Sequence, residues 1–196
     1  MNLWFATNNK RKKDELEAII NKKLKIPAEE GFYFNPEETG STFFENSLIK
    51  AKALKEALGN KDYVISDDSG LCVDALNGRP GVLSARYGME NKTGHVLTSA
   101  EQNLLLLDEL GDNPLRTARF VCSMILLFDN DRFIAVQQTI EGEIVGKSGA
   151  KGDGGFGYDP IFFVKEFGRT LAEISSDEKN KISHRAKAGK IIANYI

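Results

Sequence analysis

Two long β-favouring segments near the middle of this 196-residue chain constrain its fold most strongly. Residues 118–128 and 133–144 are rich in apolar and β-branched side chains, and a short polar turn containing Asp129-Asn130-Asp131 separates them. Such a pattern is typical of a β-hairpin. We therefore predict that a long antiparallel hairpin forms part of the sheet.

Helical and strand patterns alternate along the rest of the chain. Strands are predicted at 3–6, 32–34 and 161–164, and Leu16, Ile19 and Ile20 recur at helical spacing. Helices are also predicted to begin at Thr42, Thr98 and Ser175, each in a capping-box pattern. This alternation, with one antiparallel hairpin, indicates an α/β fold with a mixed sheet and flanking helices.

The helix predicted at 42–58 has two different sides. Its apolar face is predicted to contain Phe44, Leu48, Ala51 and Leu58, whereas Asn46 and Lys50 lie on roughly the opposite side.

Composition narrows the class of protein. A hydrophobic content of 41% with 28% charged residues is typical of a globular chain of one domain, or of one domain with two lobes. No segment approaches the roughly 20 apolar residues of a membrane span, and no secretory signal is recognised, so we expect a cytoplasmic protein without a membrane partner. The net charge of −2 argues against a duplex-DNA partner, and two cysteines are too few for a disulfide framework.

Two adjacent carboxylates follow the β-favouring stretch 63–65, in Ser66-Asp67-Asp68-Ser69-Gly70, where a strand is predicted to end. Side chains alternate along a strand, so Asp67 and Asp68 should point in different directions. Ligands in α/β proteins usually lie at strand ends, which makes the pair a candidate for binding a metal or water. By itself, the stretch is better explained as a solvated turn.

Two further polar segments could serve a phosphate chain. Thr7-Asn8-Asn9-Lys10-Arg11-Lys12 joins a strand to a helix, whose first amides lie at the positive end of the dipole, although most such segments are only an Asn N-cap followed by a solvated basic turn. Glu38, in Glu37-Glu38-Thr39-Gly40, would complete a magnesium site with Asp68 if loop and strand converge. Acidic residues before a helix are also favourable with its dipole, and the sequence does not decide between these.

A glycine-rich loop and a basic cluster complete the candidates. Residues 149–160 place five glycines around Phe156 and Tyr158, which can stack on a flat base with Asp159 as acceptor, or can plug the edge of the core. Lys179, His184 and Arg185 would align only if the helix breaks near Ser183. No second histidine lies at ligand spacing, so no transition-metal site is predicted.

Taken in order, these motifs resemble the inosine/xanthosine triphosphate pyrophosphatase family over nearly the whole chain. No single block is decisive, but their chance assembly is very unlikely, and Asn8 departs from the glycine that bacterial relatives often carry in that turn. The matching segments are 7–12 with Glu15, 37–40 with Phe43, Glu45, Asn46 and Lys50, 66–71, Pro80-Gly81 with 84–87, 154–160 and 183–185.

The resemblance implies an elongated mixed α/β fold with two lobes around a central cleft, in a homodimer. It also implies Mg²⁺-dependent hydrolysis of non-standard purine nucleoside triphosphates (ITP, dITP, XTP) to the monophosphate and pyrophosphate. In this family, Asp68 would activate water and Glu38, Asp68 and Asp67 would hold the metal. The implied substrate contacts are Thr7, Asn8, Asn9, Lys12 and Lys50 for phosphate, Ser69 and Lys179, and Phe156, Gly157, Tyr158, Asp159, His184 and Arg185 for the base.

Other functions stay open. A related pyrophosphatase could act on standard or modified pyrimidine nucleotides, although the His184-Arg185 pair and residues 156–159 favour purines. A non-catalytic nucleotide-binding protein is disfavoured by Asp67, Asp68 and Glu38, because carboxylates repel polyphosphate unless a metal intervenes. A single-stranded nucleic-acid binder is disfavoured by the acidic balance of the chain.

Overall fold

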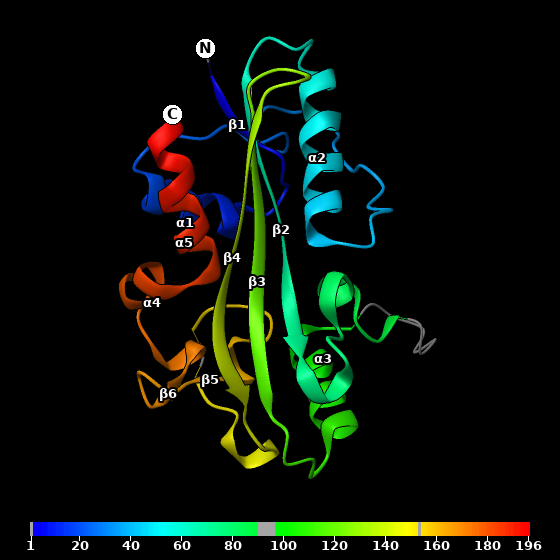
Figure 1. Ribbon diagram of the computed structural model, residues 1–196, viewed down its shortest axis with the longest axis vertical. Coiled ribbons are helices and arrows are strands. Elements are labelled where there is room, and N and C mark those ends of the chain that lie inside the picture. Colours follow the sequence, from blue (N-terminus) through cyan, green and yellow to red (C-terminus); the bar gives the residue numbers. More distant parts are fainter. Residues whose placement is uncertain (1, 90–96, 153) are drawn as a thin grey trace. The chain divides into compact units, whose positions relative to one another are not determined.

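The computed structural model describes residues 2–89, 97–152 and 154–196 (Figure 1). Its strands form one six-stranded sheet in the order β1-β2-β3-β4-β5-β6. β1 and β2 are parallel, whereas β4, β5 and β6 pair antiparallel, so the predicted mixed α/β sheet is confirmed. The elements are β1 (Leu3–Phe5), α1 (Lys10–Ile20), α2 (Phe43–Ala57), β2 (Tyr63–Val73), α3 (Ser99–Leu110), β3 (Thr117–Leu127), β4 (Phe133–Ile144), β5 (Phe162–Val164), β6 (Arg169–Thr170), α4 (Ser176–Ile182) and α5 (His184–Ile192).

The chain divides into two compact units. Unit 1 comprises Met1–Ser69, Cys122–Thr139 and Asn180–Ile196, and unit 2 comprises Gly70–Val121 and Ile140–Lys179. The arrangement of one domain with two lobes around a cleft stays a prediction. Within the described residues, no helix is long and apolar enough to cross a membrane.

The sheet of unit 1 buries both of its faces, because successive side chains of each strand point to opposite sides. Phe5 and Ile65 lie in a core with residues of α1 and α5, whereas Trp4 and Val64 lie in a second core with residues of α2. Figure 1 accordingly shows α1 and α5 on one side of the strands and α2 on the other. The same alternation assigns each later residue of β2 to one of these faces.

The predicted end of β2 is wrong. β2 continues through Asp67 and Asp68 to Val73, because β3 lies beside it on its other edge. It is β1 that ends here, since its register with β2 runs only from Leu3 opposite Tyr63 to Phe5 opposite Ile65. The carboxylate pair therefore lies just beyond the carboxyl end of β1.

The strand predicted at 32–34 is also wrong. The edge of β1 is occupied by Lys25 instead, whose backbone accepts from Phe5 N at 2.8 Å and donates to Leu3 O at 3.0 Å. The aromatics of 32–34 serve the core, because Phe34 is buried and the ring of Phe32 lies 5.7 Å from that of Trp4. Apolar, β-favouring residues form a strand only where a partner edge is open to them.

The face predicted for α2 is confirmed in part. Ala51 is buried and Leu48 and Leu58 pack against the same core, but Phe44 is exposed. The helix also turns a polar stripe toward β2, with Lys55 near its end donating to the carbonyl oxygen of Phe128 at 2.7 Å. The buried residues of α2 are Asn46, Ser47, Lys50, Ala51, Leu54 and Lys55.

Locally determined features agree with the sequence. The capping boxes at Thr42 and Thr98 are both formed, and β3 and β4 are adjacent strands joined by the predicted polar turn. The predicted break near Ser183 is confirmed, because α4 ends at Ile182 and the Ser183 hydroxyl accepts from Ala186 N as the N-cap of α5.

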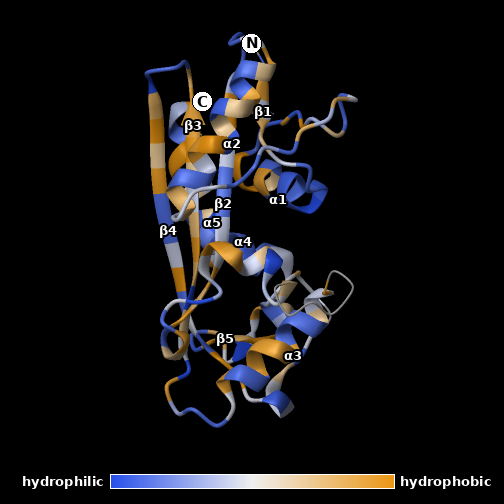
Figure 2. Cartoon of the chain, turned by 90° about the vertical axis from the view of Figure 1, so that its right-hand side faces the viewer, coloured by the Kyte–Doolittle hydropathy of each residue, from blue (hydrophilic) through white to orange (hydrophobic). Residues whose placement is uncertain are grey.

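In unit 2, α3 buries Gln102, Asn103, Leu106, Leu107 and Leu110, and Figure 2 shows both hydrophobic and hydrophilic residues along this helix. The rings of Phe120 and Phe162 lie 4.7 Å apart in the interior of the same unit. The glycine-rich loop at 149–160 belongs to the same unit, and its Asp153 lies outside the described residues.

Candidate functional site

Asp67 and Asp68 point to opposite faces of β2, as predicted. Asp68 shares its face with Val64, toward α2, and its Oδ1 accepts from Lys50 Nζ at 3.0 Å. Asp67 shares its face with Ile65, toward α1 and α5, and its Oδ1 accepts from Lys12 Nζ at 3.0 Å. Each carboxylate is thus paired with a lysine from a different helix.

Glu38 and Asp68 converge on one ammonium group. Lys50 Nζ lies 2.8 Å from Glu38 Oε1 and 3.0 Å from Asp68 Oδ1, so the loop before α2 and strand β2 meet there. Burial alone would lower the pKa of Lys50, but the charges of Asp68, Asp67 and Glu38 outweigh it and raise that pKa. Two carboxylates therefore share a single centre of positive charge.

Burial has the largest effect on the pKa of Asp68. It raises the pKa of this carboxyl, the charge of Lys50 opposes the rise, and the nearby Glu38 adds to it. A buried carboxylate with a raised pKa beside a cation is a suitable general base, because it can take a proton from water more readily than an ordinary Asp.

Asp67 lies in a dense network of charges. Its Oδ2 accepts from Arg185 Nε at 3.2 Å and Nη2 at 3.1 Å, and Arg185 Nη1 donates to Glu15 Oε2 at 2.6 Å. Burial alone would raise the pKa of Asp67, but the charges of Lys12, Arg185 and Lys50 hold it well below its usual range. The carboxylate of Asp67 is ionised at neutral pH and fully engaged by donors.

The two lysine–aspartate pairs act on each other electrostatically although they lie on opposite faces of β2. The charge of Asp67 raises the pKa of Lys50, and the charge of Lys12 lowers that of Asp68. This is possible because β1 does not extend past Phe5. All four groups thus form one cluster around the edge of β2, which we call the carboxylate–lysine cluster: Lys12, Lys50, Asp67 and Asp68, with Glu38.

The turn after β1 is built by its own side chains. Thr7 Oγ1 accepts from Asn9 N at 3.1 Å, and Asn9 Oδ1 accepts from the amides of Arg11 and Lys12, so Asn9 is the N-cap of α1. Asn8 Nδ2 donates to Phe34 O at 2.5 Å. These bonds fix the turn beside Lys12, while the phosphate contacts assigned to Thr7, Asn8 and Asn9 stay predictions.

In unit 2, the glycine-rich loop is folded onto Asp159. The Asp159 Oδ2 atom accepts from Lys179 Nζ at 2.6 Å and from Phe156 N at 2.8 Å. Lys179 Nζ also lies 4.8 Å from the centre of the Phe156 ring. Gly155 has a φ of +70°, and a Cβ there would lie 2.0 Å from Asp159 Oδ2, so this position requires glycine.

Other loop residues are held by hydrogen bonds within unit 2. Tyr158 is buried, and its hydroxyl donates to Ser84 O at 2.8 Å; the Gly157 carbonyl accepts from Asn103 Nδ2 at 3.1 Å. The alignment predicted for Lys179 with His184 and Arg185 stays a prediction. Asp159, Lys179 and Phe156 contact one another, whereas Tyr158 turns its hydroxyl into the protein. Their contacts with a base stay predictions.

The remaining predicted residues lie in unit 1. His184 is buried at the start of α5, and Ser69 Oγ accepts from Arg185 Nη2 at 3.1 Å. Within the described part of the chain, no group of three or more His, Cys, Asp or Glu side chains is arranged to hold a metal. A metal at Glu38 and Asp68 would therefore depend on further oxygen ligands, such as water or phosphate.

Two residues of this region received no role from the sequence. Glu15 is an ion-pair partner of Arg185, and Asn46 is fully buried between Asp68 and the loop of Glu38. Asn46 lies one helical turn before Lys50, and this spacing was the signal that the two share a face. The partner of Glu15 is 170 residues away in sequence, so no local pattern identifies it.

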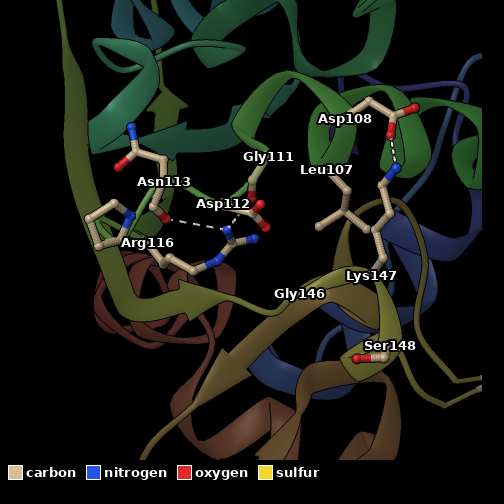
Figure 3. A pocket seen from close by; sticks show the side chains of 10 residues that line it. Leu107, Asp108, Gly111, Asp112, Asn113, Arg116, Gly146, Lys147 and Ser148 are labelled. Atoms are coloured by element: carbon tan, nitrogen blue, oxygen red, sulfur yellow. Dashed lines mark hydrogen bonds and ion pairs between the residues drawn. The ribbon is translucent and has the colours of Figure 1, made fainter.

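A cavity of about 740 Å³ in unit 2 lies apart from these residues along the chain (Figure 3). Its Arg116 donates to the carbonyl oxygens of Gly111, Asn113, Ile144 and Val145. These bonds hold the chain that follows α3 against the end of β4, so the guanidinium has a structural role.

Comparison with known proteins agrees with this architecture. The model of the Ham1 family matches residues 3–195. The chain is similar to proteins named dITP/XTP pyrophosphatase from Treponema denticola (50% identity over 100% of this chain and 98% of the relative) and Halalkalibacterium halodurans (44% identity over 100% of both). It is also similar to the solved structure of the Staphylococcus aureus Ham1 protein (TM-score 0.85, 39% identity, 100% of this chain and 97% of that chain). For a HAM1 protein from Coxiella burnetii, the TM-score is 0.87, with 35% identity over 100% of this chain and 98% of that chain.

Proposed function

The chain belongs to the Ham1 family, and on this basis we propose that it hydrolyses non-standard purine nucleoside triphosphates to the monophosphate and pyrophosphate. Relatives named dITP/XTP pyrophosphatase match it over their whole lengths, which supports dITP and XTP, together with ITP, as its substrates. The observation that carries the proposal is the carboxylate–lysine cluster of unit 1, in which carboxylates and lysines are held together beyond the end of β1.

The cluster has the groups that this reaction needs. Phosphoryl transfer depends mainly on positioning and on stabilisation of charge. Lys12 and Lys50 would offset the charge of the triphosphate, and Asp68 would orient and deprotonate the water that attacks the α-phosphorus. Arg185 and Lys12 keep Asp67 ionised, and Asp67 in turn holds Lys12 in place.

Glu38 and Asp68 fit a magnesium ion. Both carboxylates already bind one cation, the Lys50 ammonium, and Mg²⁺ is usually held by one or two carboxylates together with substrate phosphates. When bound, the metal would neutralise developing phosphate charge. Asp67 fits this role less well than predicted, because its two oxygens already accept from Lys12 and Arg185.

The base would be read by the residues assigned to it from the resemblance. A pocket that donates hydrogen bonds to a 6-oxo group would leave those donors unpaired against adenine, at a cost of about 1–3 kcal/mol per buried group. The expected homodimer and cytoplasmic location remain parts of this proposal.

A substrate panel tests the proposal. Pyrophosphate release is measured with Mg²⁺ for dITP, ITP, XTP, GTP, ATP and the pyrimidine triphosphates. We expect the highest kcat/KM for ITP, dITP and XTP. Preference for pyrimidine triphosphates would favour the alternative pyrophosphatase, and binding without turnover would favour a non-catalytic nucleotide-binding protein.

Asp68→Asn is the matched variant for the catalytic step. It keeps the size of the side chain but removes the base, so we expect a loss of roughly 10²–10⁴-fold in kcat with nucleotide binding partly retained. Turnover at the wild-type rate would show that Asp68 is not the base.

A further inference from the structure

One buried amide connects Asp68 to the loop that carries Glu38, and both of these carboxylates converge on Lys50. Asn46 is fully buried in α2, and its Oδ1 accepts from Gly40 N at 2.8 Å. Its Nδ2 donates to Asp68 Oδ2 at 3.4 Å. The side chain thus contacts the loop that carries Glu38, two residues before Gly40, and the strand that carries Asp68.

The loop side of this junction is closely packed. A Cβ on Gly40 would lie 2.7 Å from Asn46 Oδ1 and 2.6 Å from Glu45 Cβ. Only a glycine backbone therefore approaches the amide closely enough for the Gly40 N–H to reach it. The capping box of α2 lies next along the chain, where the carboxylate of Glu45 accepts from Ser41 N and Thr42 N.

Neighbouring Ser47 offers a contrast on the same helix. It is also fully buried, and its Oγ lies 2.9 Å from the Oγ of Ser66 on β2. This contact packs α2 onto β2 but involves neither the Glu38 loop nor Asp68. The two adjacent polar residues therefore have different roles: Ser47 packs the helix onto β2, and Asn46 links the Glu38 loop to Asp68.

We propose that Asn46 is a positioning residue that fixes the carboxylates of Glu38 and Asp68 at the separation needed to share one cation. The inference rests on the proposed function, because it concerns the same cluster. Outer partners that orient metal ligands typically contribute 10–100-fold to metal affinity or activity. Without the amide, the hydrogen-bonded link from Gly40 through Asn46 to Asp68 would be lost.

The test uses Mn²⁺ as a spectroscopic probe of the site in the full-length protein. Mn²⁺ affinity is measured by electron paramagnetic resonance without nucleotide, and the Mg²⁺ concentration giving half-maximal ITP hydrolysis is measured separately from kcat. For Asn46→Ala we expect Mn²⁺ binding to weaken by about 10–100-fold, with a matching rise in the half-maximal Mg²⁺ concentration.

Two further variants make the result decisive. Gly40→Ala leaves Asn46 intact but forces the loop away from its amide, so this variant should also weaken Mn²⁺ binding. If Asn46→Ala does not fold, Gly40→Ala alone tests the inference. Ser47→Ala is the control: it should lower stability but leave Mn²⁺ affinity unchanged.

Three results would overturn the inference: wild-type Mn²⁺ affinity in the folded Asn46 and Gly40 variants, an equal loss in Ser47→Ala, or no Mn²⁺ binding by the wild-type chain. The proposed function fails differently. A wild-type chain whose Mn²⁺ affinity depends on Asn46 but which hydrolyses no nucleoside triphosphate would support the positioning role and refute the activity.

Discussion

Asp67 and Asp68 are neighbours in sequence but lie in different chemical surroundings. Asp67 accepts from Lys12 and Arg185, which hold its pKa below the usual range against the effect of burial. Asp68 has one lysine and a second carboxylate nearby, and burial raises its pKa. One aspartate is therefore suited to remain an anion that positions cations, and the other to exchange a proton.

The pH dependence of stability should reveal the first of these roles. Because the folded-state pKa of Asp67 is depressed, its ion pairs stabilise the fold above the unfolded-state pKa of about 3.9 and this contribution is lost as the pH falls toward the lower folded value. Asp67→Asn should lower the free energy of unfolding at pH 7 by about 3 kcal/mol, since it removes the anion that Lys12 and Arg185 share.

Urea unfolding of both proteins between neutral pH and about pH 3 checks this expectation. The difference in unfolding free energy should be constant above the unfolded-state pKa and should shrink below it. A difference that stays the same down to the lowest pH would mean that the ionisation of Asp67 does not stabilise the fold.

The sequence predicted the divergence of these two aspartates, because alternation along a strand is a local rule. It left the approach of Glu38 to Asp68 open, since that depends on where a loop meets a strand. It gave Arg185 a role at the base but not its pairing with Asp67, which joins residues 118 positions apart. Only tertiary packing brings such pairs together.

At the level of elements, α1 and α5 carry Lys12 and Arg185 to the same face of β2, and the two helices pack against each other. Their contact is close at Gly189 of α5, where a Cβ would lie 2.9 Å from Ile19 Cγ2 and 3.0 Å from Leu16 Cδ1 of α1. The helix spacing at this point therefore depends on the missing side chain.

Gly189→Ala tests this dependence. The better helix propensity of Ala would stabilise α5 by about 1 kcal/mol, but overpacking typically costs about 1–3 kcal/mol. We expect net destabilisation in urea unfolding. Ile19→Ala removes the nearest methyl group, so the double variant should be more stable than the sum of the single effects predicts. Strict additivity would show that the two side chains do not meet.

Elements that depend on neighbouring residues were predicted well. The capping boxes at Thr42 and Thr98 and the break at Ser183 each use hydrogen bonds within a few residues. The strand at 32–34 was wrong because Lys25 occupies the edge of β1. The apolar face of α2 was predicted only in part: Ala51, Leu48 and Leu58 pack in the core, but Phe44 is exposed, because the helix also buries hydrogen bonds to Ser66 and Asp68.

For the whole molecule, the alternation of helices and strands together with the long hairpin of β3 and β4 was enough to predict a mixed sheet. The parallel register of β1 with β2 was not predictable, because it joins segments about 60 residues apart and is fixed by two cores that form together. That register places the end of β1 beside Asp67 and Asp68, so the position of the cluster follows from the fold rather than from any local motif.

Removal of metal should separate the stability of the fold from the reaction. In the structure, Lys50 already compensates Glu38 and Asp68, and both cores of unit 1 are apolar, so folding does not require a cation at the cluster. We expect EDTA to abolish nucleotide hydrolysis and added Mg²⁺ to restore it, with little change in Tm. Mg²⁺ with pyrophosphate should raise Tm, because ligands that bind only the folded state stabilise it by about 2.7 kcal/mol at 100 times their Kd.

Lys50→Met is the informative comparison: it leaves the two carboxylates uncompensated, so its fold should become metal-dependent, with a Tm that EDTA lowers and Mg²⁺ raises. A wild-type Tm that falls sharply in EDTA would instead show that Lys50 alone does not compensate the charges of Glu38 and Asp68 when no metal is bound.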